Sequence, residues 1–414
     1  MKYYLSFAIL LIILQVTSTS LKAGGFQISL NAAGNIAMGH TGIANAENAS
    51  GIYFNPGSLV HNPKRSIISG FSLVDLRMEF EDEISGQKYT NEYGNSFPLY
   101  FYGDWALDST SRWRVGMGIY NPFGNNLDWQ DHWPGRFVTS EIDLKTFYFQ
   151  PTVSYKVTER LGIGLGPILA YGDVLIRKDI PLAINDMTDG EVLLEGNAIG
   201  WGFNAGIFYD LNDFINLGVS FISNVDVAPN DGTATFNVPA LLRDSFPDGN
   251  ISTRLRLPFH TGLGIQVKPS EKFSLNFDLN YTGWSSYDSL IVQFENTTSV
   301  LNDTREPRLY KNNFAFRFGG SYKPANNLII RFGTYFDMTP VQDNFLSPET
   351  PDSDRIGLSA GLSFKLGKSL MADLSVLYTE TMQRTEKTEL NYAGLGGSYK
   401  GKALIGSFGL SFFY

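Results

Sequence analysis

The sequence predicts an all-β protein, a transmembrane antiparallel β-barrel of about fourteen strands with its N-terminal segment inside the lumen. Three observations predict this class: apolar and polar residues alternate, connections alternate between short and long, and aromatic residues and glycine are abundant. Of the 414 residues, 31 are Phe, 21 are Tyr and 42 are Gly, and only 18% are charged. This composition suits a β-rich protein that presents apolar surface to a medium other than water.

The alternation has the period of a strand and is clearest over residues 273–282, 314–319, 356–365 and 404–414. A soluble sandwich alternates as well, but its strands are usually about five or six residues long. Several runs here exceed the roughly ten residues that a tilted strand needs to cross a bilayer. The runs are centred near residues 72, 101, 116, 150, 168, 201, 220, 260, 280, 317, 332, 361, 376 and 407.

The connections between these runs fall into two classes of length. Tight turns are predicted at residues 108–112, 158–160, 211–213, 269–272, 324–327 and 367–369, and long polar loops at 81–94, 123–142, 229–251, 296–309 and 339–354. Short turns at one rim and long loops at the other are typical of outer-membrane barrels.

The first 63 residues differ from the rest. Residues 1–23 contain Lys2, an apolar run and a polar tail, which predicts a secretory signal peptide cleaved after Ala23. No later window reaches the roughly 18 apolar residues of a spanning helix, so an exported chain of this kind can cross a membrane only as a closed barrel. Residues 24–63 are rich in Gly, Ala and Asn and lack alternation, which predicts a plug, or hatch. The predicted domains are therefore the signal peptide 1–23, the hatch 24–63 and the barrel 64–414.

Two Asn-Pro sequences mark turns of special interest. One ends the predicted hatch, and its gate candidates are Phe54, Asn55, Pro56 and Gly57. The other follows the third run, where Pro cannot donate to the ladder and Gly weakens it. Either that strand ends at Tyr120, or a kink opens a gap in the wall. The candidates for such an opening are Asn121, Pro122 and Gly124.

Charge and chemistry exclude several functions. The net charge of -9 without a basic stripe argues against nucleic acid, and the absence of Cys excludes disulfides and thiolate chemistry. The acidic loops at residues 186–191 and 352–354 fall short of a calcium-loop pattern, so no metal or cofactor is predicted. Residues 357–361 have the Gly-x-Ser-x-Gly spacing, but Ser359 lies within a strand pattern where a nucleophile elbow needs a strand-to-helix turn. We therefore predict no enzyme and no catalytic residue, with an outer-membrane lipid hydrolase as a distant alternative.

Several blocks resemble, in order and spacing, the FadL-type family of outer-membrane transport proteins for long-chain fatty acids and aromatic hydrocarbons. The blocks are residues 24–27, 52–57, 257–258, 278–284, 310–312, 337–341 and 351–355. In the second block Gly57 stands where the family's Asn-Pro-Ala motif has Ala. The resemblance implies an outer-membrane location, a fourteen-stranded barrel, a ligand pocket above a hatch, and lateral exit at a kinked third strand.

The resemblance further implies passive uptake of hydrophobic compounds, with long-chain fatty acids as the expected substrate and aromatic hydrocarbons such as toluene or xylene as the alternative. A fatty-acid carboxylate needs a cation, for which the candidates are Lys311, Arg317 and Arg256. A general porin or adhesin is a more distant alternative.

The aromatic C-terminal residue Tyr414 is expected to be recognised by the barrel-assembly machinery, and the expected surroundings are outer-membrane lipid and lipopolysaccharide. A monomer is expected because a closed barrel leaves no strand edge to pair.

Overall fold

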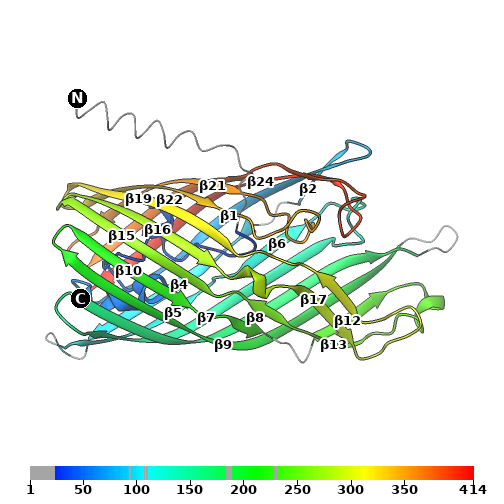
Figure 1. Ribbon diagram of the computed structural model, residues 1–414, viewed down its shortest axis with the longest axis horizontal. Helices are drawn as coiled ribbons and strands as arrows, with labels where there is room; N and C mark the ends of the chain where they lie inside the picture. Colours follow the sequence, from blue (N-terminus) through cyan, green and yellow to red (C-terminus); the bar gives the residue numbers. More distant parts are fainter. Residues whose placement is uncertain (1–23, 93–94, 107, 109–110, 183–188, 228–231) are drawn as a thin grey trace.

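The alternating segments form antiparallel strands that close into a barrel (Figure 1). The structure, a computed structural model, describes residues 24–92, 95–106, 108, 111–182, 189–227 and 232–414. The predicted signal peptide and residues 186–188 of one acidic loop lie outside the described residues. The first strand pairs with the last in an unbroken register from Ser66↔Phe413 to Asp82↔Gly397, which closes the wall.

Fourteen strands form the wall, and each contains one of the run centres predicted from the sequence, so the predicted strand count and order are confirmed. They are β1 (Ser66–Asp82), β4 (Leu99–Ala106), β5 (Trp113–Tyr120), β7 (Glu141–Lys156), β8 (Leu161–Ile180), β9 (Gly190–Asn212), β10 (Ile215–Ile222), β15 (His260–Ser270), β16 (Phe273–Thr282), β19 (Asn313–Ala325), β20 (Leu328–Asp337), β21 (Arg355–Lys365), β22 (Leu370–Thr381) and β24 (Gly397–Phe413).

The long connections are more ordered than the polar loops that the sequence predicted. They contain the short strands β2 (Lys88–Thr90), β3 (Asn95–Ser96), β6 (Gly124–Asp128), β11 (Val225–Val227), β12 (Gly232–Asn237), β13 (Gly249–Thr253), β14 (Leu255–Leu257), β17 (Ser289–Phe294), β18 (Thr304–Pro307) and β23 (Arg384–Glu386), with the 3-10 helices η2 (Ala240–Leu242) and η3 (Trp284–Ser286). The loop prediction was wrong there because the hairpins continue to pair beyond the wall, toward the end of the barrel at the right of Figure 1.

The period of two sorts side chains between the two faces of the wall. On β16 the exposed Phe277 lies between Ile265 of β15 and Phe318 of β19 in the outward row. Its neighbour Asp278 is buried opposite Arg317 in the inward row. In this part of the wall the outer face is therefore apolar and the inner face is polar. Within the part of the chain that the structure describes, no helix is long and apolar enough to cross a membrane.

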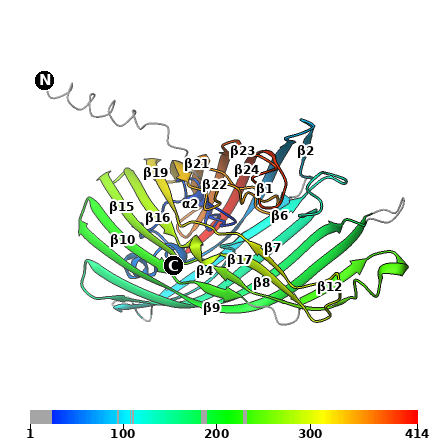
Figure 2. The same ribbon diagram turned by 45° about the vertical axis from the view of Figure 1, so that its right-hand side comes forward.

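The N-terminal segment, residues 24–62, lies within the ring of strands (Figure 2). It contains only short helices, α2 (Ala33–Ile36), α3 (Gly51–Phe54) and the 3-10 helix η1 (Pro56–His61), because its frequent Gly and Asn disfavour longer ones. Its side chains form the centre of the protein's apolar core together with inward-facing aromatic residues of β4, β5 and β7.

Candidate functional site

Inward-facing glycines of the wall let the N-terminal segment pack directly against the backbone of the strands, because no side chain lies between them. A Cβ placed on Gly333 would lie 2.1 Å from the nitrogen of Gly39, and one on Gly206 would lie 2.1 Å from Oδ1 of Asn55. Other wall glycines with such contacts to the segment are Gly162, Gly164, Gly218, Gly264 and Gly319. A wall with larger side chains at these positions could not hold the segment in this place.

Buried polar side chains of the wall bind the segment's backbone. Asp278 accepts hydrogen bonds from the amides of Gly42 at 2.8 Å and Ile43 at 3.1 Å. Asn204 donates to the carbonyl oxygens of Ile52 and Tyr53, each at 3.0 Å. These bonds satisfy backbone groups that an irregular segment cannot satisfy within itself.

The segment residues predicted as a gate are all buried. Asn55 donates from Nδ2 to the carbonyl oxygens of Ile43 at 2.7 Å and Ile207 at 3.0 Å, and it accepts from the amide of Gly57. A Cβ on Gly57 would lie 2.8 Å from the carbonyl oxygens of Gly162 and Gly206, so this wall leaves no room for the Ala of the family motif. Phe54 and Pro56 are buried on either side of Asn55. This turn therefore joins the segment to β8 and β9.

The wall is interrupted at the third strand. β5 ends at Tyr120 and β6 resumes at Gly124, and both pair with β7. At the interruption, the side chain of Asn121 bridges the neighbouring strands β4 and β7. Its Oδ1 accepts a hydrogen bond from the amide of Leu99, and its Nδ2 donates one to the carbonyl oxygen of Thr146. Within the described residues, β6 pairs with β7 alone, so its other edge faces β1 and β3 without a ladder.

The start of the N-terminal segment lies against this interruption. The amide of Ile28 donates to the carbonyl of Pro122 at 2.8 Å, and Phe26 accepts from the amide of Gly124 at 3.1 Å. The segment thus occupies part of the edge that a wall strand would otherwise fill.

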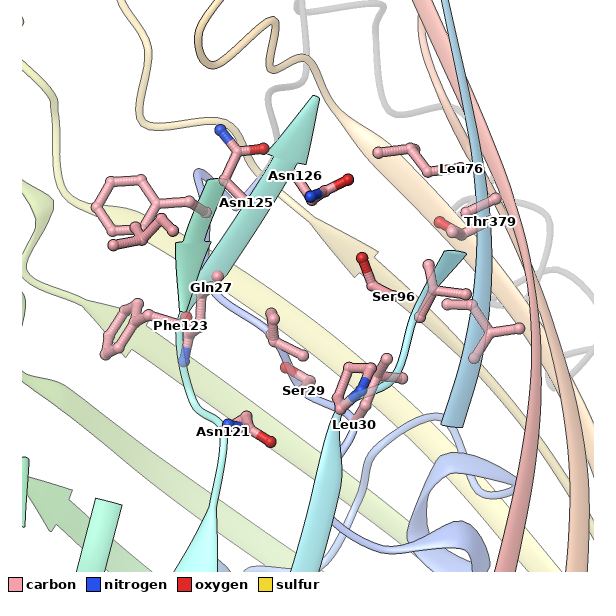
Figure 3. Close-up of a pocket in the computed structure, with 18 of the residues that line it drawn as sticks. Gln27, Ser29, Leu30, Leu76, Ser96, Asn121, Phe123, Asn125, Asn126 and Thr379 are labelled. Carbon is pink, nitrogen blue, oxygen red and sulfur yellow. The ribbon is translucent and has the colours of Figure 1, made fainter. Parts of the chain in front are cut away.

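A cavity of about 560 Å³ lies at the interruption (Figure 3). In Figure 3, Asn125 and Asn126 of β6 lie across it from Leu76 of β1, with Ser96 between them. The cavity is lined by the buried, inward-facing Met78 and also by Phe147 and Lys145, which lie on the outward parity of β7. Because residues of both faces line one cavity, it passes through the wall.

Two smaller apolar cavities continue this one toward the long loops. The second, about 80 Å³, shares Phe26, Asn125, Leu144 and Thr350 with the first. The third, about 160 Å³, shares Ile176, Leu194, Leu290, Val292 and Glu349 with the second and is lined at its far end by Phe236, Phe246 and Phe294. The three cavities therefore form a series from the loops to the interruption in the wall.

The inward-facing cations along this series are each paired with a carboxylate. Arg355 donates to Oδ2 of Asp337 at 2.9 Å, and Lys178 lies 3.5 Å from Glu306. Arg308, which is 7% exposed, pairs with Glu349 and, at 3.0 Å, with Glu306. Burial raises the pKa of Glu349, against the opposing effect of Arg308. An anionic ligand in these cavities would compete with carboxylates already in place.

The three cations predicted as head-group contacts are not brought together and lie outside the three cavities. Arg317 is buried and donates to the segment, at 3.0 Å to Ser29 and at 3.4 Å to the carbonyl of His40. Arg256 forms a two-point ion pair with Asp226, at 2.7 and 2.8 Å. Lys311 is exposed in the loop before β19. Their role in head-group binding stays a prediction.

Sequence reasoning missed most of the cavity lining. Leu76, Met78 and Ser96 carry no motif, and their place follows from the absent pairing between β1 and β6. The sequence indicated the interruption through Asn121-Pro122 but not which strands would border it. Ser359, in contrast, lies within β21 as its alternation predicted, and its Oγ accepts from the amide of Gly39.

A closed barrel with an apolar outer face, a filled lumen and a cavity through its wall defines an outer-membrane β-barrel of the transport class. Comparisons with known proteins specify it further. The family model for outer membrane protein transport protein (OMPP1/FadL/TodX) matches residues 14–414. The chain therefore belongs to this family, which comprises outer-membrane transporters of hydrophobic compounds.

Individual relatives are distant but match along most of their length. Outer membrane protein P1 of Haemophilus influenzae is 23% identical, covering 88% of this chain and 89% of its own. A long-chain fatty acid transport protein of Salmonella typhi is 22% identical, covering 96% of each chain. Among solved structures, a Pseudomonas aeruginosa FadL homologue has a TM-score of 0.82 at 17% identity, covering 94% of this chain and 99% of its own. The Pseudomonas putida toluene transporter TodX has a TM-score of 0.71 at 17% identity, covering 92% and 98%. At these identities the structural matches show the fold alone.

Proposed function

We propose that this protein takes up hydrophobic molecules from outside the cell and releases them sideways into the membrane through the gap between β1 and β6. The observation that carries the proposal is the cavity of about 560 Å³ lined from both faces of the wall. An apolar molecule that passes from an apolar cavity directly into lipid avoids the free-energy cost of exposing its surface to water, which an aqueous exit would impose.

The N-terminal segment acts in this proposal as the hatch. Its residues 26–28 border the cavity and bind the edge of the interrupted strand, so their displacement widens the opening. Displacement there breaks the two backbone bonds to Pro122 and Gly124, the hydrogen bond from Thr282 to Gln27 and the aromatic packing around Phe26. The turn at Asn55-Pro56 stays on the wall as the fixed end.

Of the two substrate classes, the paired cations favour uncharged hydrocarbons. A carboxylate placed near Arg355 would also face Asp337 and Asp352, and one near Arg308 would face Glu349 and Glu306. Long-chain fatty acids are the second candidate, favoured by the similarity to the long-chain fatty acid transport protein of Salmonella typhi and by the length of the series of cavities. Their head groups would then bind Arg317, Lys311 or Arg256.

Mass spectrometry of bound lipid and parallel binding of toluene and oleate to the purified barrel test the substrate class. Saturable toluene binding with weak oleate binding supports the uncharged class. Tight oleate binding that is lost on neutralising Arg317 or Lys311 would favour fatty acids instead. Binding of neither ligand would contradict the proposed function.

The lateral exit is tested by obstructing the gap. Ser96→Trp adds an indole beside the cavity where β3 ends, and Leu404→Trp adds one on the lipid-facing side of β24 as a matched control. We expect cellular uptake to fall in the first variant and to persist in the second, while ligand binding inside the lumen stays measurable in both. Unchanged uptake by a well-folded Ser96→Trp variant would refute the lateral route.

A further inference from the structure

A cavity of about 870 Å³ lies at the end of the barrel opposite to the long loops. It is lined by residues 45–48 and 61–64 of the N-terminal segment and by the ends of wall strands that meet in short turns. It shares no lining residue with the cavity at the interruption in the wall. Short turns face the periplasm in bacterial outer-membrane barrels, so we call this cavity the periplasmic vestibule.

The lining of the vestibule is basic, although the chain as a whole has a net charge of -9. Seven cations and four carboxylates line it, which gives the vestibule a net charge of +3. Six of the cations are lysines, and among the residues that the structure describes their ammonium groups have no carboxylate within ion-pair distance. They are Lys64, Lys268, Lys272, Lys323, Lys365 and Lys368.

The other charged groups of the vestibule do not neutralise these lysines. The seventh cation, Arg331, is buried and pairs with Asp373 and with Glu47 of the segment, at 3.2 and 3.6 Å. The remaining carboxylates of the lining are Asp210, Asp213 and Glu271. The lysines therefore carry an excess of positive charge within one cavity.

Three of the lysines lie on the inner face of the wall. Lys268 of β15, Lys323 of β19 and Lys365 of β21 each follow a buried polar residue by two positions, which places them on the inward parity. One strand separates β15 from β19 and one separates β19 from β21, so the strands that carry these lysines are about 10 Å apart. The Debye length at physiological salt is about 8 Å, so screening at this spacing is incomplete and the ammonium groups repel one another.

The two ends of the barrel treat their cations differently. Along the cavities that lead from the long loops, Arg308, Arg355 and Lys178 each have a carboxylate partner. A wall that only had to be polar would not need unpaired lysines at one end. The vestibule also contains an unsatisfied donor or acceptor from the segment, because Nε2 of His61 is buried and has no partner among the described residues.

We propose that the periplasmic vestibule binds a small, multiply charged anion whose clustered negative oxygens, from carboxylates or from phosphate, pair with Lys268, Lys323 and Lys365. A volume of about 870 Å³ is typical of a small-molecule site. The flexible stem of lysine lets the ammonium groups converge on one ligand. A trianion matches the net charge of +3, whereas a hydrocarbon or a single carboxylate leaves most of the lysines without a partner.

The bound anion joins the wall to the N-terminal segment. Lys64 and His61 of the segment line the same vestibule as the three wall lysines, so a ligand that contacts both groups stabilises the segment in its place. The site lies at the opposite end of the barrel from the residues proposed to receive hydrophobic molecules. It can therefore be absent while the proposed function stands, and the reverse.

Calorimetric titration of citrate into the purified barrel at low ionic strength tests the site. We expect saturable binding that weakens as salt is added, and about tenfold weaker binding of acetate, which has a single charge. Inorganic pyrophosphate, titrated in parallel, distinguishes the two sources of negative oxygen, and the tighter of the two ligands identifies the class. Binding of neither citrate nor pyrophosphate, or binding only of a tetraglutamate peptide, would overturn the proposal.

Variants of the wall lysines locate the site. Each of Lys268→Gln, Lys323→Gln and Lys365→Gln should weaken citrate binding by up to about fivefold, and the three together by at least about tenfold. Lys387→Gln, at an exposed lysine of the loop that follows β23, is the matched control and should leave the affinity unchanged. Unchanged toluene binding in every variant verifies the fold. Native citrate affinity in the triple variant, or an equal loss in Lys387→Gln, would show that the lysines do not form a site.

Discussion

Gly333→Ala should release the N-terminal segment from the wall without unfolding the barrel. The added Cβ would lie 2.1 Å from the nitrogen of Gly39, whereas ordinary contacts begin near 3.4 Å, so the segment must withdraw by about 1.3 Å. Both groups are backbone, which cannot turn aside as a side chain can. Overpacking of this kind costs about 1–3 kcal/mol, and ~2 kcal/mol shifts the population of the released segment by up to about 30-fold.

Hydrogen exchange measures that shift directly. The amides of Gly39 and His40, which donate to Ile36 and Asn35, should exchange about 30-fold faster, while those of β20 and β21 keep their protection. Gly406→Ala is the matched control, since a Cβ there has no atom within 4 Å. Native protection of Gly39 in a folded Gly333→Ala barrel would refute the idea that wall glycines hold the segment.

Three further predictions concern the segment and the loops. Burial, reinforced by the guanidinium of Arg317, lowers the pKa of His40 from 6.5 to about 3. The segment should therefore lose stability as the pH falls below 6.5, and the loss should reach about 2 kcal/mol at pH 5. His40→Asn, which tolerates the positive φ of this position, should abolish that pH dependence in hydrogen exchange; an unchanged slope would contradict the assignment. Arg308→Met should destabilise the loop that contains Glu349 by about 3–5 kcal/mol, because it leaves a buried carboxylate without its partner, and proteolysis of residues 339–354 should become faster. Lys178→Met should be nearly neutral, because that ion pair is more exposed. Equal proteolysis rates for the two variants would refute the role of the buried pair. Asn55→Ala removes three hydrogen bonds, two of them buried, and should expose the amide of Gly57 to exchange. A protected Gly57 amide would show that packing alone holds the turn.

The sequence was sufficient to predict the strands of the wall, because strand periodicity is a local property. Phe277 and Asp278 fall on opposite faces whatever strands lie beside them, so which residues of a strand share a face could be predicted. Pairing beyond the wall was not predictable in this way. Residues 124–128 lack a clean alternation, yet they form β6 because β7 continues far enough to pair with them.

The cavity could not be predicted because it is defined by a pairing that does not form. Asn121 and Pro122 indicate where the third strand breaks, but the width of the gap depends on β1, β3 and the segment that partly fills it. The predicted cations illustrate the same limit. Arg256 was predicted as a head-group contact, yet β14 pairs with β11 instead of a wall strand, and Asp226 becomes the partner of Arg256.

Paired charges along the cavities and a local attachment of the segment at their edge suit the same mechanism. A path for hydrophobic molecules needs its polar groups satisfied internally, because a ligand without charge cannot repay their desolvation. The pairs of Arg308 and Arg355 meet that need inside the path. A movable segment, in contrast, needs an attachment that is strong when closed and local enough to break without disturbing the wall. The backbone hydrogen bonds of Phe26 and Ile28 to the interrupted strand meet both conditions, because they lie near the end of the segment, while the hydrogen bonds of Asp278 and Asn204 retain the remainder.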